Sequence, residues 1–102
     1  MADVYKALSS PVRREILSLL QSGDLTAGDI ADALADKGMS ISKPTLSGHF
    51  NILKSAHLVV TDKEGTTITY SINTSVMEDL MRQMMTLFQS NKINSEEKNN
   101  VE

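Results

Sequence analysis

Apolar residues near the amino end of the chain recur with the period of an α-helix. A first helix places three of them on one face, namely Val4, Ala7 and Leu8. It should end before Pro11, because proline disfavours helical backbone at the residue that precedes it. Ser10 is then the expected N-cap of a second helix that has Pro11 at its first position and stops at Gly23. The apolar face of this second helix consists of Val12, Ile16, Leu17, Leu19 and Leu20.

Two more helices are predicted between residues 26 and 57. Thr26 and Asp29 have the spacing of a capping box at the start of the third helix, which should end at Lys37 and Gly38. Ser42 can cap the fourth helix. One face of the fourth helix carries Leu46, Phe50, Leu53 and His57, and the opposite face carries Pro44, Gly48, Asn51 and Ser55. The fourth helix is therefore apolar on one side and small and polar on the other.

The pattern changes after residue 57. Residues 58–61 and 66–72 are rich in β-branched side chains, and residues 62–65 between them are typical of a turn, so we expect a β-hairpin. A last helix, capped by Asn73 or Thr74, carries one apolar stripe. The stripe consists of Met77, Leu80, Met81, Met84, Met85 and Phe88. Residues 91–102 are polar and without periodicity, which predicts a folded domain over 1–90 and a disordered tail over 91–102.

The order of these elements predicts a mainly α fold with a β-hairpin wing, built from five helices and two strands. The third and fourth helices have the geometry of a helix-turn-helix, whose second helix fits the major groove of DNA. The hairpin beside it can reach the flanking backbone or minor groove. We therefore expect a winged helix-turn-helix that binds double-stranded DNA.

Composition narrows the alternatives. A chain of 102 residues holds one domain and no separate ligand-binding domain. It has no cysteine, and its two histidines are eight residues apart, so we expect no disulfide, no zinc site and no cofactor. No phosphate-binding loop or nucleophile motif indicates an enzyme. The amino end lacks the order of a signal peptide and no apolar run has bilayer length, so a cytoplasmic protein without membrane insertion is expected.

The distribution of charge favours DNA more than its sum does. The net charge of −3 argues against a binder that relies on overall positive charge. Between residues 42 and 63, however, Lys43, Lys54 and Lys63 outnumber the single acid Asp62, which leaves a local balance of +2. The basic residues thus gather on the helix and hairpin that would face DNA.

Four segments together resemble the ArsR-type regulators, and within them the metal-independent autorepressors of the SdpR type. They are residues 7–17 (ALSSPVRREIL), 26–31 (TAGDIA), 42–54 (SKPTLSGHFNILK) and 70–72 (YSI). The resemblance covers residues 4–88. It implies a homodimer of winged domains in which residues 42–55 are the recognition helix and the first and last helices pair across the two-fold axis. It also implies a repressor that occupies an inverted-repeat operator and leaves DNA when an inducer, a small molecule or a protein, binds. Metal sensors of the family carry cysteines in the helix that corresponds to residues 29–37, and this chain has none.

The candidate DNA contacts lie on the fourth helix and the hairpin. They are Ser42, Lys43, Thr45, Ser47, Gly48, His49, Asn51, Lys54 and Lys63. The alternative for this group is a solvated helix face. His49 either donates to a phosphate or closes the core beside Phe50, and His57 is expected to be a packed structural residue. For Arg13 and Arg14 the options are phosphate contact or pairing with an acid such as Glu15.

The candidate dimer interface combines the first and last helices. Its residues are Val4, Leu8, Met77, Leu80, Met81, Met84, Met85 and Phe88. Burial of this stripe within one chain is the alternative, and its methionines could also admit a small hydrophobic ligand or a partner protein. The rival function is a protein-interaction module. A metal sensor based on Glu78 and Asp79 is disfavoured, because neighbouring residues on a helix point about 100° apart.

Overall fold

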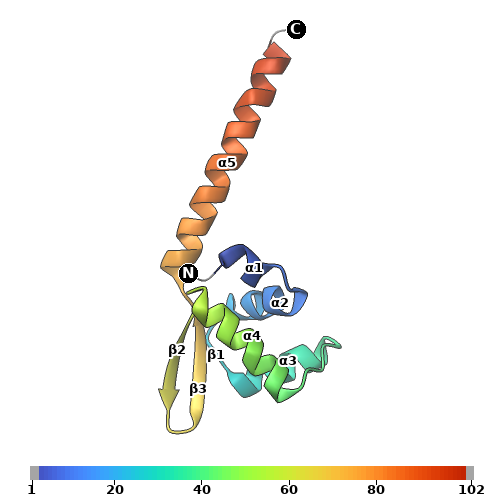
Figure 1. Cartoon of the computed structure of the whole chain (residues 1–102), viewed down its shortest axis with the longest axis vertical. Coiled ribbons are helices and arrows are strands. Elements are labelled where there is room, and N and C mark those ends of the chain that lie inside the picture. Colours follow the sequence, from blue (N-terminus) through green and yellow to red (C-terminus); the bar gives the residue numbers. More distant parts are fainter. Residues whose placement is uncertain (1–2, 101–102) are drawn as a thin grey trace.

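The computed structural model describes the backbone of residues 3–100 and the side chains of residues 3–89. Within these residues, five helices and three strands follow one another (Figure 1). They are α1 (Val4–Leu8), α2 (Pro11–Leu20), β1 (Leu25–Thr26), α3 (Ala27–Asp36), α4 (Lys43–Ser55), β2 (Val59–Glu64), β3 (Thr67–Ile72) and α5 (Thr74–Asn100). The mainly α fold with a hairpin wing is confirmed. The short strand β1 was not predicted from the sequence.

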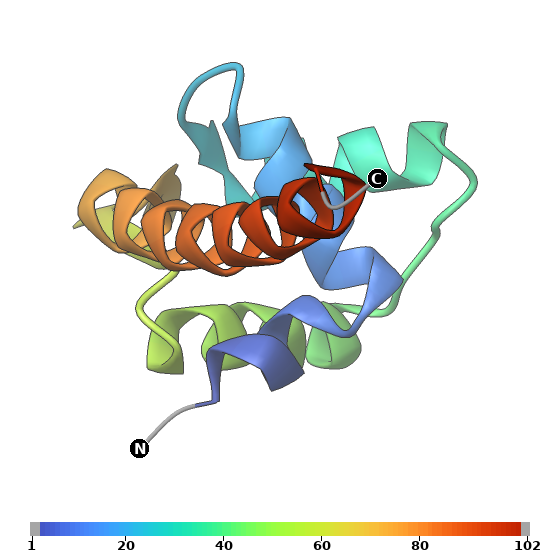
Figure 2. The ribbon, with the colours of Figure 1, turned by 90° about the horizontal axis from the view of Figure 1, so that it is seen from above.

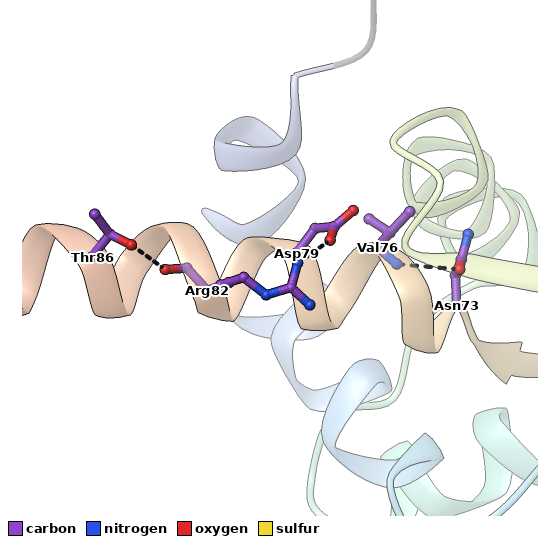
Figure 3. A network of polar contacts seen from close by, with 5 residues as sticks. All are labelled: Asn73, Val76, Asp79, Arg82 and Thr86. Atoms are coloured by element: carbon purple, nitrogen blue, oxygen red, sulfur yellow. Dashed lines mark hydrogen bonds and ion pairs between the residues drawn. The ribbon is translucent and has the colours of Figure 1, made fainter.

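Side-chain caps start the helices at the positions that the sequence predicted. The Ser10 hydroxyl accepts a hydrogen bond from the Arg13 amide at 3.3 Å. Thr26 and Asp29 form a complete capping box, with bonds of 3.1 and 3.3 Å. The Asn73 side chain accepts from the Val76 amide at the start of α5 (Figure 3). These caps satisfy amide groups that a helix end leaves without backbone partners.

Helices α3 and α4 end in the same way but with different residues. In both, the chain turns through a left-handed residue, Gly38 (φ 79°) after α3 and His57 (φ 60°) after α4. The amide of the following residue bonds back to the helix, Met39 to Leu34 and Leu58 to Leu53, which is the Schellman arrangement. The prediction that His57 packs on the inner face of the fourth helix is wrong, because it lies beyond the helix end and is exposed.

The three strands form an antiparallel sheet in the order β1-β3-β2. In the hairpin, Glu64 pairs with Thr67, so the turn consists of Gly65 and one further residue. The predicted turn over residues 62–65 is therefore wrong in its bounds, since residues 62–64 belong to β2. A two-residue turn with glycine first, here with φ 59°, continues the strand twist and so allows the longer pairing.

The core lies between α2, α3, α4 and the base of the sheet. Its fully buried side chains are Ile16, Ile30, Leu34, Leu53 and Leu58. Phe50 of α4 stacks on Tyr70 of β3, with ring centroids 4.3 Å apart and an interplanar angle of 23°. Burial raises the pKa of the Tyr70 phenol above its usual 10.0. This packing fixes α4 against the strand that carries the wing.

Helix α5 leaves this body on the side opposite to the wing (Figure 1). Its 27 residues span about 40 Å at the rise of an α-helix. The radius of gyration is 17.3 Å, whereas a compact chain of this length has about 13 Å. Residues 91–100, expected from the sequence to be disordered, continue α5 in the structure, because extending a formed helix avoids the cost of a new nucleus. Residues 101–102 of the predicted tail lie outside the described residues.

Candidate nucleic-acid interface

Helix α4 is held by its inner face. Leu46, Phe50 and Leu53 are each at most 5% exposed and anchor the helix on the core. The opposite side of α4 faces away from the core along the whole helix. Its orientation follows from packing and not from flexible surface contacts.

One flank of α4 carries exposed basic and polar side chains. At 100° per residue, Lys43, Ser47 and Lys54 fall within about 40° of one another, and Asn51 lies about 40° further round the helix. All four are exposed. The two lysines are 11 residues apart, so the basic flank extends for roughly 16 Å along the helix.

Ser42 and Thr45 hold the amino end of α4. The Ser42 hydroxyl accepts from the Thr45 amide at 3.4 Å and donates to Thr45 Oγ1 at 2.9 Å. Because the Thr45 hydroxyl accepts in this pair, its own hydrogen is free to donate elsewhere. Both residues are exposed, so the predicted contacts lie on an accessible helix end.

Gly48 lies on the outer surface of α4, between the two flanks. A Cβ atom built at this position would meet no atom within 4 Å. The glycine is therefore not required by packing within the chain. Its absent side chain leaves the helix backbone open to close approach from outside.

Asn51 has a different environment from the first half of α4. Together with Ile52 and Ser55 it lines a shallow pocket whose other wall is formed by Asp3 and Lys6 of α1. Figure 2 shows α1 beside α4 in this region. The Asp3 carboxylate is the N-cap of α1, so a negative charge stands near Asn51. The structure thus brings Ser42, Lys43, Thr45 and Ser47 together at the start of α4 and sets Asn51 next to α1.

His49 lies on the other flank of α4, where it meets α2. Its Nδ1 atom is 3.0 Å from Nη1 of Arg13, a side chain that is only 7% exposed. Burial, and to a smaller extent the charge of Arg13, lower the pKa of the His49 imidazole below its usual 6.5. The ring is therefore neutral at pH 7.

Within the described residues neither Arg13 nor Arg14 pairs with an acid, so that alternative is wrong, whereas phosphate contact by the exposed Arg14 stays a prediction. The two guanidinium groups bind backbone carbonyls of α1, Arg13 those of Lys6 and Ala7 and Arg14 that of Leu8. Cations are favourable at the carboxyl end of a helix, where carbonyls have no backbone partner. Glu15 pairs instead with Lys37 at 2.8 Å, which links α2 to the end of α3.

Lys63 lies in β2 and not in the turn, near the tip of the wing. Because side chains alternate along a strand, Lys63 shares a face with buried Val59. The exposed acids Asp62 and Glu64 lie on the other face, with Val60. The strand therefore separates the positive charge of the wing from its negative charges.

The apolar stripe of α5 divides into two parts. Met77 is half-buried and Leu80 is 9% exposed; both lie near the body, where Val4 and Leu8 of α1 also pack on the core. Further along, four side chains that we call the distal stripe are 54–69% exposed, namely Met81, Met84, Met85 and Phe88. Asp79, Arg82 and Thr86 lie on the opposite side of the helix, joined by an ion pair of 2.7 Å and a hydrogen bond (Figure 3).

Other kinds of site have little support in the part of the chain that the structure describes. Residues 3–89 contain no group of three metal-binding side chains. Among the described helices, none is both long and apolar enough to cross a membrane.

Comparison with known proteins identifies the family. A family model described as a helix-turn-helix domain matches residues 8–62, more than half of the chain. The transcriptional repressor SdpR of Bacillus subtilis is 47% identical over 85 residues, which cover 83% of this chain and 89% of the relative. The chain belongs to the ArsR-type winged helix-turn-helix regulators. The resemblance noted in the sequence is thereby confirmed.

Further ArsR-type relatives support the assignment. The arsenical resistance operon repressor of Staphylococcus aureus is 33% identical over 92 residues, covering 90% of this chain and 84% of the relative. A solved homodimeric winged helix-turn-helix DNA-binding domain from Mycobacterium bovis, described as a possible ArsR-family regulator, is 30% identical with a TM-score of 0.63. That likeness covers 86% of this chain and 77% of the other.

In this ArsR-type regulator, Arg13 is the site residue whose role the sequence did not reveal. A positive charge at the start of α2 opposes the helix dipole, and this was the available signal that some other interaction must hold it. The partners themselves are six, seven and 36 residues away in the chain, and only the fold brings them together.

Proposed function

We propose that the chain is a homodimeric repressor that binds double-stranded DNA at an inverted-repeat operator. One α4 would enter the major groove at each half-site, and each wing would contact the flanking backbone. The observation that carries this proposal is the exposed flank with Lys43, Ser47 and Lys54 on a helix whose other face is anchored in the core. The relatives from B. subtilis and S. aureus are named as repressors, which supports the same function here.

The distal stripe of α5 supports the dimer. Four large apolar side chains more than half exposed form a surface that water covers unfavourably. An open groove of about 340 Å³ lies between α1 and the first turns of α5, lined in part by Val4, Tyr5 and Leu80. A second copy related by a two-fold axis would cover the distal stripe, and the M. bovis relative is described as homodimeric.

Dimerisation also explains how a chain of net charge −3 would bind a polyanion. The two-fold axis doubles the basic flank of α4 and the Lys63 face of each wing. The two recognition helices would then meet major grooves about 10 bp apart, or a multiple of this distance, on an inverted repeat.

The test measures affinity against salt concentration, on an operator selected from random duplexes and on a scrambled duplex. Lys63→Ala should flatten the slope of log affinity against log salt by up to about 1.8, since each lost phosphate contact removes about 0.9 and the dimer has two. Sequence preference should stay nearly unchanged. Arg82→Ala removes the same charge from the polar side of α5 and should leave the slope as it is.

Base contacts are expected from the polar residues of α4. Thr45→Ala or Asn51→Ala should relax the preference at particular base pairs by about 1–3 kcal/mol where the side chain binds a base edge. A Lys63 variant with the wild-type slope would remove the wing from the proposed interface.

A protein-interaction module is the second candidate, favoured by the exposed distal stripe and the acidic net charge. Equal binding of operator and scrambled duplex by the wild type would support it against DNA recognition. The proposed repressor acts in the cytoplasm, catalyses no reaction and needs no metal or cofactor. Its inducer, a small molecule or a protein, stays a prediction of the family resemblance.

A further inference from the structure

Arg13 connects three helices through one buried guanidinium group. Its Nε atom donates to the Ala7 carbonyl at 2.7 Å, and Nη2 donates to the Lys6 carbonyl at 3.0 Å. Its Nη1 atom is 3.0 Å from Nδ1 of His49. A side chain of α2 therefore joins the carboxyl end of α1 to the flank of α4.

The chemistry of the pair determines the state of the His49 ring. A guanidinium group stays protonated in proteins and can only donate hydrogen bonds. Nδ1 of His49 must therefore accept, and the ring proton resides on Nε2. The ring has a single N–H group, and its position follows from the Arg13 contact.

The Nε2 group is accessible from outside the chain. It has no partner among the hydrogen bonds of the described residues, and in the same residues no buried side-chain nitrogen or oxygen lacks a partner. Nε2 of the half-buried ring therefore reaches solvent. It presents a neutral donor on α4, within one turn of Thr45 and Ile52.

We propose that Arg13 is a positioning residue for DNA binding, because it holds His49 in the tautomer whose Nε2–H donates to an oxygen of the DNA phosphate backbone. The inference rests on the proposed function for the presence of DNA. It adds a residue that does not touch DNA itself. The same guanidinium also donates to carbonyls of α1, so the position of the Nε2–H donor depends on how α1 packs.

The first test uses the full wild-type chain without DNA. Nitrogen-15 NMR at pH 7 distinguishes a protonated from an unprotonated imidazole nitrogen, and His57, exposed and beyond the end of α4, is an internal reference. We expect one tautomer for His49, with the proton on Nε2. A proton on Nδ1, or a tautomer mixture like that of His57, would overturn the inference, whether or not the chain binds DNA.

The second test compares two substitutions at His49. Asparagine can place an oxygen near the position of Nδ1 but reaches no further, whereas glutamine can place a donor near the position of Nε2 and loses the Arg13 contact. His49→Asn should lower operator affinity about tenfold in the dimer with an unchanged salt slope, because the lost donor is neutral. His49→Gln should keep more of the affinity and unfold at lower temperature.

A third variant tests the coupling. Arg13→Lys retains the charge but has one nitrogen in place of three, so it should release the ring and lose as much affinity as His49→Asn. In the double variant the two losses should not add, because both remove one contact. Additive losses, or a His49→Asn protein that binds like the wild type, would overturn the inference. If Arg13→Lys does not fold, the His49 pair and the NMR measurement decide. A wild type that fails to prefer the operator overturns the proposed function and, with it, the DNA contact.

Discussion

Helices α4 and α5 carry similar apolar stripes, but only one of them is covered. On α4 the whole stripe, from Leu46 to Leu53, is buried by α2 and the sheet. On α5 the cover ends after Leu80, where the distal stripe begins, and the helix itself projects beyond the body (Figure 1). An apolar stripe in the sequence indicates that these side chains favour burial. Whether the same chain or a partner buries them depends on which elements pack against the helix in the fold. The stripe of α4 therefore serves folding and, in our proposal, the distal stripe of α5 serves assembly.

The largest effect on stability is expected in the buried stripe of α4. Leu53→Ala removes a fully buried side chain and should lower the free energy of unfolding by about 2–5 kcal/mol. Urea denaturation measures it. Ser47→Ala on the exposed flank of the same helix is the control and should stay within about 0.5 kcal/mol of the wild type. Equal effects would mean that α4 is not anchored as described.

Substitutions in the exposed distal stripe of α5 should weaken the proposed dimer. Met81→Glu with Met84→Glu would place unpaired charges in the proposed dimer interface, so the dissociation constant of the dimer should rise about 100-fold or more and operator binding should weaken. The isolated monomer should remain folded, since both side chains are more than half exposed. Sedimentation measures the assembly, and Thr86→Glu on the polar side of α5 is the control. A compact wild-type monomer at micromolar concentration would contradict the proposal.

The fold could be predicted from the sequence because its signals are local. Caps at Ser10, Thr26 and Ser42 depend on residues three positions apart, and the period of apolar residues locates the helix faces. The same local signals could not reveal β1, whose two residues pair with Thr69 and Tyr70 far along the chain. They also extended the apolar face of α4 to His57, because periodicity alone cannot show where a helix ends.

The residues of the candidate site could be predicted from the sequence, but the contacts between them could not. The sequence identified the exposed residues at the start of α4, and the structure describes them as accessible. It did not indicate that Asp3 approaches Asn51, or that Arg13 approaches His49, since these contacts depend on how α1 and α2 pack against α4. Their roles toward DNA stay predictions.

A smaller effect on stability is expected at Gly48, on the outer surface of α4. Gly48→Ala should raise the free energy of unfolding by about 1 kcal/mol, because alanine favours the helix and its Cβ meets no neighbour. If DNA approaches the helix backbone here, the same substitution should weaken operator binding. Thermal unfolding and DNA affinity, measured together, show whether the glycine serves folding or binding. Unchanged affinity would place DNA elsewhere on α4.

The smallest effect is expected at the end of α4, and the end of α3 provides the comparison. His57→Gly should stabilise the fold by about 0.5–1 kcal/mol. Glycine adopts the left-handed conformation without a Cβ penalty, and this gain exceeds the extra chain entropy that glycine loses on folding. Gly38→Ala at the matching position of α3 should destabilise it by about 1–2 kcal/mol. Urea denaturation measures both. A destabilised His57→Gly would indicate that the histidine makes a contact that offsets its strained backbone.

Thr26 belongs to two parts of the molecule at once. Its backbone pairs with Thr69 in the strand that carries the wing, while its side chain caps α3. Thr26 therefore couples the orientation of α3 to that of β3. In the proposed complex, this coupling would fix the distance along the DNA between the contacts of α4 and those of the wing. Half-sites of a different length would be rejected by shape, before any side chain distinguishes one base from another.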